Sequence, residues 1–257
     1  MKNAASLAPF MPLQQDYTAY TADDRWVWHT LFERQLQVLP QVASARFLDG
    51  IPRVGFVADK IPDFDEVNPR LLLATGWRLV AVPGIVDDRT FFELLAARQF
   101  PATTWLRTPA QLDYLEEPDM FHDVFAHVPL LTDRFFADFL QQLGVLALRF
   151  LHHAEAVELL ARLYWFTVEF GLIAEAGGLR IYGAGILSSG GETRFCLSEE
   201  PRRQPFDVAE VLATPFAKDR FQEVYFVIDS YEQLVAAVPV LEAELSRQFT
   251  AAVAASC

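Results

Sequence analysis

Two histidines and one acid in apolar surroundings are the residues of this chain best suited to hold a metal ion. His122 and His127 are two of its five histidines, and five positions separate them in the segment EPDMFHDVFAHVPLLTD. Glu169 lies in the almost unbroken apolar run ARLYWFTVEFGLI, with no cation three or four positions away along a helix. Burial of an isolated carboxylate costs several kcal/mol. Glu169 therefore needs a distant arginine, a hydrogen-bond network or a metal ion.

Two imidazoles and one carboxylate on one face of a metal ion form the facial triad of non-haem Fe(II) oxygenases, which leaves coordination positions open. On a regular α-helix, residues five positions apart are rotated by about 140°, so His122 and His127 would diverge. They converge if the second ring lies at a helix end, and Pro129 predicts such an end. Core packing or a surface position for the histidines, and a buried salt bridge for Glu169, are the alternatives.

Composition narrows the class of protein. The 257 residues are 52% hydrophobic and 13% aromatic, which is enough for a large core. The formal charge is −13 and no Lys/Arg cluster stands out, so we expect no nucleic-acid partner. Cys196 and Cys257 are the only cysteines, which suggests reduced thiols in a cytoplasmic protein. No apolar run is long enough for a transmembrane helix, so we expect no membrane association.

The elements that must position the candidate ligands are mainly helical. Apolar spacing and end signals predict helices from Thr21 to Pro40 and over 63–75, 88–100, 111–116, 119–127, 133–150, 155–174, 207–214 and 230–248. Short strands are predicted within 77–87, 193–197 and 221–229, with an extended segment over 101–109 and a loop over 180–192. The fold class is therefore mainly α (α+β), with one domain.

Several segments together resemble the pterin-dependent aromatic amino acid hydroxylases, and in particular their short bacterial members. EPDMFHDVFAHVPLL is similar to the histidine motif of that family, ARLYWFTVEFGLI to its glutamate helix and YGAGILSS to the loop that follows. TGWRLVAVPGIV, FFELLAARQFPATTWLR and FQEVYFVIDS are similar to further segments in the same order, so the resemblance covers roughly residues 15–235. Residues 1–20 are expected to form a flexible arm, and the resemblance implies a single basket-like catalytic domain over 21–257. Neither a regulatory domain nor a tetramerisation tail is expected, so the protein would be a monomer or small oligomer.

The resemblance also implies roles for individual residues. The iron ligands would be His122, His127 and Glu169, with Tyr164 beside the iron. The substrate-binding residues would be Arg107, Asp119, Trp165, Phe170, Ser188 and Ser189. The pterin-binding residues would be Gly84, Val86, Asp88 and Phe91. Read alone, Arg107 is equally a structural arginine, and Asp119 an N-cap after Pro118.

These roles imply a non-haem Fe(II), tetrahydropterin-dependent monooxygenase that hydroxylates L-phenylalanine to L-tyrosine with O2. Lys218 stands where phenylalanine-specific relatives tend to carry an aliphatic residue, so phenylalanine 3-hydroxylation and tryptophan hydroxylation are alternatives. A zinc hydrolase would lack the His-Glu-x-x-His arrangement that supplies a general base. A non-catalytic binding paralogue would not need all three ligands and Arg107.

Overall fold

The structure is a computed structural model that describes residues 11–249 apart from 114, 116, 218 and 219. Its α-helices are α1 (Ala22–Leu36), α2 (Leu39–Val42), α3 (Ala45–Val54), α4 (Phe64–Thr75), α5 (Asp88–Ala96), α6 (Arg134–Leu148), α7 (Ala154–Tyr164), α8 (Ala184–Leu187), α9 (Gly190–Phe195), α10 (Val208–Ala213) and α11 (Tyr231–Phe249). Its strands are β1 (Arg78–Val82), β2 (Gln99–Thr103), β3 (Leu172–Glu175), β4 (Gly178–Ile181), β5 (Arg202–Pro205) and β6 (Val224–Ile228). Three short 3-10 helices are η1 (Tyr17–Ala19), η2 (Pro109–Gln111) and η4 (Val128–Thr132), and two π-helical turns are η3 (Phe121–Ala126) and η5 (Trp165–Glu169). Among the described residues, no helix is long and apolar enough to cross a membrane.

The strands form two small sheets. β1 pairs in parallel with β2, and α5 is the crossover between them, as a parallel pair requires. The second sheet has the order β4-β3-β6-β5, in which β3 and β4 form an antiparallel hairpin and β6 runs parallel to both β3 and β5. Gly178 opens β4 with a φ of 106°, a conformation that glycine adopts without strain.

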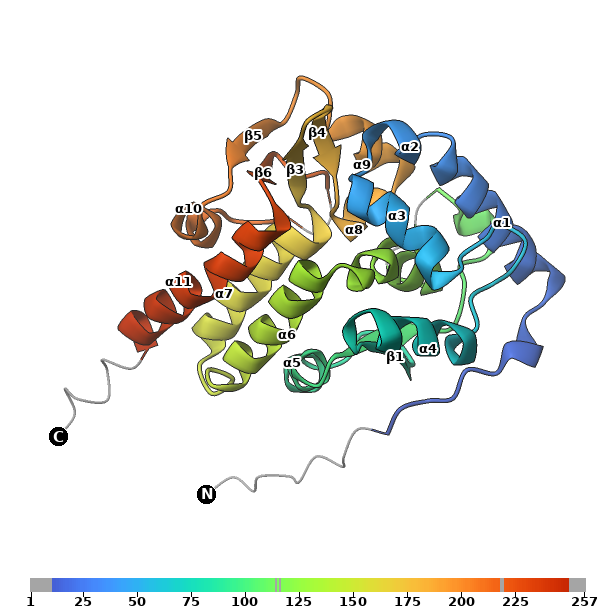
Figure 1. Ribbon diagram of the computed structural model, residues 1–257, viewed down its shortest axis with the longest axis horizontal. Coiled ribbons are helices and arrows are strands. Elements are labelled where there is room, and N and C mark those ends of the chain that lie inside the picture. Colours follow the sequence, from blue (N-terminus) through green and yellow to red (C-terminus); the bar gives the residue numbers. More distant parts are fainter. Residues whose placement is uncertain (1–10, 114, 116, 218–219, 250–257) are drawn as a thin grey trace.

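Helices enclose a hydrophobic core that runs as one cluster from α1 to α11. In Figure 1, α6, α7 and α11 lie side by side, α1 to α3 lie at the other end of the molecule, and the green segment with η3 and η4 passes between them. η4 packs on α3, α4 and α6, while η3 contacts α1, β2 and α8. The candidate ligand segment is therefore held on several sides by elements that are distant in the sequence.

Local signals placed several helices correctly. Thr21 caps α1 through a capping box with Asp24, and Gly76 ends α4 in the left-handed region with a φ of 78°. Pro40 was expected to stop the first helix, but that helix ends at Leu36 and Pro40 lies inside α2. Proline is tolerated in the first turn of a helix, where its missing N–H has no partner to lose.

The predictions for 155–174 and 180–197 need correction. The long predicted helix stops at Glu169, and residues 172–175 form β3 because they pair with β4 and β6. The predicted loop over 180–192 contains the end of β4, all of α8 and the start of α9, and the predicted strand over 193–197 begins within α9. Helix α3 and strand β5 were not predicted. Pairing between distant segments decides β3, β4 and β5. Helix α3 does carry local signals, because Ser44 caps its start and Gly55 ends it in the left-handed region.

The described part of the predicted arm lies against the core. Leu13 forms a bridge to Ala81 of β1. The Tyr17 hydroxyl donates to the carbonyl of Ile61 at 2.8 Å, and the Tyr20 hydroxyl donates to the carbonyl of Thr104 at 2.6 Å.

Candidate metal centre and its pocket

The two π-helical turns carry the candidate ligands. In a π-helix a backbone N–H bonds to the carbonyl five residues earlier, so residues five apart return to the same side. His122 lies within η3 and His127 directly follows it. Around Glu169, the N–H of Phe170 donates to the carbonyl of Trp165, five positions earlier, at 2.9 Å. The expected helix end at His127 is confirmed, and π-helical winding adds the reason why the two rings share a face.

The three side chains converge. Nε2 of His127 lies 3.3 Å from Nε2 of His122 and 3.3 Å from Oε1 of Glu169, while Nε2 of His122 lies 3.5 Å from Oε2 of Glu169. Two atoms that each lie about 2.1 Å from one ion are about 3.0 Å apart at a right angle and about 3.4 Å apart at a tetrahedral angle. The cluster therefore fits a single ion, and it is the only such cluster of His, Cys, Asp or Glu in the described part of the chain.

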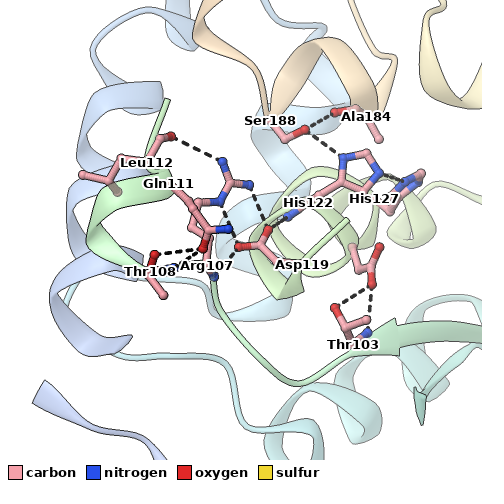
Figure 2. Close-up of polar contacts among 11 residues, drawn as sticks. Thr103, Arg107, Thr108, Gln111, Leu112, Asp119, His122, His127, Ala184 and Ser188 are labelled. Carbon is pink, nitrogen blue, oxygen red and sulfur yellow. Dashed lines mark hydrogen bonds and ion pairs between the residues drawn. The ribbon is translucent and has the colours of Figure 1, made fainter. Parts of the chain in front are cut away.

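A serine fixes the tautomer of one ligand. The Ser188 hydroxyl donates to the carbonyl of Ala184 at 2.9 Å and lies 2.9 Å from Nδ1 of His122. Because its proton is used on the carbonyl, the hydroxyl accepts from the Nδ1–H of His122. Nε2 of His122 is then left with its lone pair directed at the cluster, as a metal ligand requires. Figure 2 shows Ser188, His122 and His127 in this order.

The protonation states also suit metal binding. Burial lowers the pKa of His122 below its ordinary value, against the opposing effect of Glu169. Burial alone would raise the pKa of Glu169, but the charges of His127 and His122 outweigh it and lower that pKa. A neutral imidazole and an ionised carboxylate are the forms that bind a metal.

Glycines let the segment after β4 approach Glu169. A side-chain carbon at Gly183 would lie 2.4 Å from the Glu169 carbonyl oxygen and 2.5 Å from the Gly171 nitrogen, which is closer than real contacts allow. A side-chain carbon at Gly185 would lie 2.7 Å from the Phe170 ring. The motif YGAGILSS thus allows α8 to pack directly against the end of η5.

Arg107 and Asp119 form a buried, two-pronged ion pair. Nε and Nη2 of Arg107 donate to the two carboxylate oxygens of Asp119 at 2.9 and 2.8 Å, and the backbone N–H of Arg107 donates at 2.9 Å. Asp119 also accepts from the backbone N–H of His122 at 3.2 Å, which links the pair to the ligand segment. Figure 2 shows the guanidinium facing this carboxylate. The Asp119 side chain thus holds Arg107 and also bonds the backbone at the start of η3, whose N-cap residue is Met120.

A cavity brings the metal cluster together with most of the expected pterin-binding residues. Its lining includes His122, His127, Glu169, Tyr164, Gly84, Val86 and Phe91. The Tyr164 ring meets the Phe91 ring edge-on, with centroids 5.3 Å apart. Burial raises the pKa of Tyr164 well above its ordinary value, so its hydroxyl stays protonated. Asp88 is exposed at the start of α5 and is not among the residues that line this cavity.

The remaining predicted residues are not among those that line this cavity. The rings of Trp165 and Phe170 contact each other with centroids 4.8 Å apart. Ser189 caps α9, because its hydroxyl accepts from the N–H of Glu192 at 3.2 Å. Lys218, on which the alternative substrates depended, lies outside the described residues.

Sequence reasoning missed Asp123, which lines the cavity next to His122. Its carboxylate accepts from the backbone N–H and the hydroxyl of Thr103, both at 2.8 Å, at the end of β2. Burial raises the pKa of Asp123, and these contacts only partly oppose it. The sequence did contain a signal for this residue, because Asp123 directly follows His122 in the same apolar run.

Two histidines and one carboxylate that converge in a helical domain are the ligand set of mononuclear non-haem iron enzymes. Comparison with known proteins gives the family. Residues 13–255 match the biopterin-dependent aromatic amino acid hydroxylase family, and the chain belongs to that family.

Relatives of this chain include phenylalanine-4-hydroxylases of bacteria and of mouse and rat. Those of Chromobacterium violaceum and Ralstonia nicotianae are 51% and 50% identical to this chain, over 86% and 89% of it and 75% and 73% of their own lengths. A crystal structure of the C. violaceum enzyme with bound iron(III) and oxidised 7,8-dihydrobiopterin matches with a TM-score of 0.87 and 49% identity. The match covers 92% of this chain and 86% of that one.

Proposed function

We propose that this protein hydroxylates L-phenylalanine to L-tyrosine, using iron, a tetrahydropterin and O2. The observation that carries the proposal is the convergence of His122, His127 and Glu169 in a chain about half identical to phenylalanine-4-hydroxylases. When bound, iron and the reduced pterin supply the redox chemistry that activates O2. The chain itself holds the metal, orients the substrate and limits access of water.

The metal is held by the three ligands from one side. The His127 side chain is 3% exposed, whereas those of His122 and Glu169 are 20% and 14% exposed. Access is therefore from the cavity, and the hydroxyl of Tyr164 borders the same space as a neutral group. Ser188 keeps the His122 ring aimed at the metal, as partners of this kind do in metal sites.

Arg107 binds the substrate carboxylate. A guanidinium has five N–H groups. Three of those on Arg107 are used, two on Asp119 and one on the Leu112 carbonyl at 3.4 Å, so two are left for a ligand. Asp119 fixes the plane of the guanidinium, which a two-pronged contact with a carboxylate requires.

The substrate ring and the pterin bind at different places near the metal cluster. Trp165 and Phe170 contact the substrate ring, with Ser189 at the edge of the site. The pterin stacks on the ring of Phe91. Its polar edge meets the loop formed by Gly84, Val86 and Asp88, and a side chain at Gly84 would face open space, so the loop backbone is accessible.

We also propose that residues 21–257 form one catalytic domain that acts as a monomer or small oligomer in the cytoplasm. One core cluster joins α1 to α11. The apolar stripe of α11, which includes Leu234, Leu241 and Leu245, is buried within the chain, where α11 packs on α6. The buried free thiol of Cys196 suits a reducing compartment.

The test is product identification. Protein loaded anaerobically with Fe(II) is incubated with L-phenylalanine, a tetrahydropterin and O2, and the products are separated by chromatography. Tyrosine formation that depends on all three additions is expected. Formation of meta-tyrosine, or a preference for tryptophan, would overturn the proposed regiochemistry or substrate, and activity with zinc alone would overturn the iron assignment.

A further inference from the structure

Gln222 links Trp165 to the chain that precedes β6. Trp165 and Phe170 are the residues proposed to contact the substrate ring, and they are called the aromatic wall below. Gln222 is 3% exposed and lies two residues before β6. Its side-chain oxygen accepts from the indole N–H of Trp165 at 3.0 Å. Its amide nitrogen donates to the carbonyls of Ala217 at 2.8 Å and Arg220 at 3.3 Å. The oxygen of this one buried side chain therefore accepts from Trp165, and both of its N–H groups donate to carbonyls of the neighbouring segment of the chain.

The bond to Gln222 selects one orientation of the Trp165 ring. Rotation of an aromatic side chain about its second torsion is broad, so packing or a hydrogen bond must fix it. The Phe170 and Phe216 rings contact the indole, with centroids 4.8 and 4.9 Å away, and such contacts alone tolerate a flipped ring. A flip would carry the indole N–H away and leave the buried oxygen of Gln222 without a donor, which is unfavourable.

Gln222 is in turn held by Glu192 of α9, the helix that follows the serine bonded to His122. Its backbone N–H donates to Oε1 of Glu192 at 3.3 Å, and the Tyr225 hydroxyl donates to the same oxygen. Glu192 lies in α9, whose N-cap Ser189 directly follows Ser188, the serine that bonds His122. The aromatic wall and the metal centre thus share one support.

We propose that Gln222 is a positioning residue that acts through Trp165 to set the shape of the substrate pocket. The inference rests on the proposed function, because Trp165 contacts the substrate only if that function holds. Removal of the Gln222 amide should loosen the indole and weaken substrate binding. The iron and pterin sites should remain unchanged.

The experiment is a double-mutant cycle with Gln222→Met and Trp165→Phe. The first change keeps the length of the side chain and removes its polar atoms, and the second removes the indole N–H. The matched control is Gln233→Met. The Gln233 side chain also bonds to backbone groups, since it accepts from the N–H of Asp229 and donates to the carbonyl of Phe206. Neither of these bonds involves Trp165, which is far from Gln233 in the sequence. KM and kcat for phenylalanine and tryptophan, KM for the pterin, and iron content are measured for each variant.

In the wild-type background, Q222M is expected to raise KM for phenylalanine about tenfold, the effect of one net hydrogen bond. It should change kcat less than about threefold and alter the ratio of phenylalanine to tryptophan use. In the W165F background the same change should raise KM less than about twofold, because coupled residues are not additive. Q233M should leave all these constants unchanged.

An equal KM effect of Q222M in both backgrounds would overturn the proposal, as would unchanged constants with only a lower Tm. Should Q222M fail to fold, Gln222→Asn provides the same comparison, since its side chain is one methylene too short to reach the indole. A wild-type protein that does not hydroxylate phenylalanine would refute the proposed function instead.

Discussion

Replacement of Asp119 by Asn should destabilise the protein and weaken phenylalanine binding together. The carboxylate accepts four hydrogen bonds, two at each oxygen: the N–H and Nε of Arg107 at one, and Nη2 of Arg107 and the N–H of His122 at the other. An amide replaces one oxygen by an NH2 group, so two of the four bonds are lost whichever way it turns.

The magnitude follows from burial. The Asp119 side chain is 0% and that of Arg107 8% exposed, so water compensates little. Two bonds to charged groups, at about 1.5–3 kcal/mol each, give about 3–6 kcal/mol. Loss of one partner from a buried ion pair costs about 3–5 kcal/mol, in agreement. At about 2–4 °C per kcal/mol for a chain of this size, we expect Tm to fall by about 6–24 °C.

The assay combines thermal unfolding, followed by circular dichroism, with steady-state kinetics. In D119N the guanidinium of Arg107 is no longer held in one plane, so it binds the substrate carboxylate less well. KM for phenylalanine should therefore rise about 10- to 100-fold, the equivalent of about 1.4–2.8 kcal/mol. The control is Asp113→Asn, whose partner Arg34 forms an exposed pair; it should leave Tm within about 2 °C. If D119N changed neither Tm nor KM beyond that control, the Arg107–Asp119 pair would not have the importance that its geometry suggests.

Three further predictions concern the metal site. Glu169→Ala should reduce the iron content after anaerobic loading, measured by mass spectrometry, to below about a tenth of wild type, because its carboxylate is one of three ligands; full iron content with coupled turnover would contradict the site. Ser188→Ala should weaken iron binding about 10- to 100-fold in chelator competition, because the His122 ring loses its partner at 2.9 Å; unchanged affinity would show that packing alone orients the ring. Gly183→Ala should lower Tm and iron content, since the added carbon meets the Glu169 backbone at 2.4 Å, at a cost of about 1–3 kcal/mol or more. Gly84→Ala, which faces open space, is its control and should leave Tm unchanged, and equal effects of the two changes would refute the steric argument.

The sequence by itself determined the chemistry of the site. Two imidazoles near an apolar run and an acid with no local cation favoured a metal over core packing or a salt bridge, and the resemblance of several motifs to one family gave iron as that metal. The structure brings the three side chains to within 3.5 Å of one another. Helices with strong end signals were also predictable, as Thr21 and Gly76 show. Caps and hydrophobic spacing act within a few residues, so a local reading suffices for them.

Tertiary structure alone decided how those groups meet. The π-helical turns that align His122 with His127 and shape the backbone at Glu169 have no local sequence signal, and packing on distant helices and strands maintains them. The segment over 180–192 contains the end of β4, helix α8 and the start of α9. Pairing of β4 with β3 and the close contact that Gly183 allows with Glu169 place the first two. Contacts between residues far apart in the chain supply the free energy for these arrangements, and no short window of sequence contains both partners.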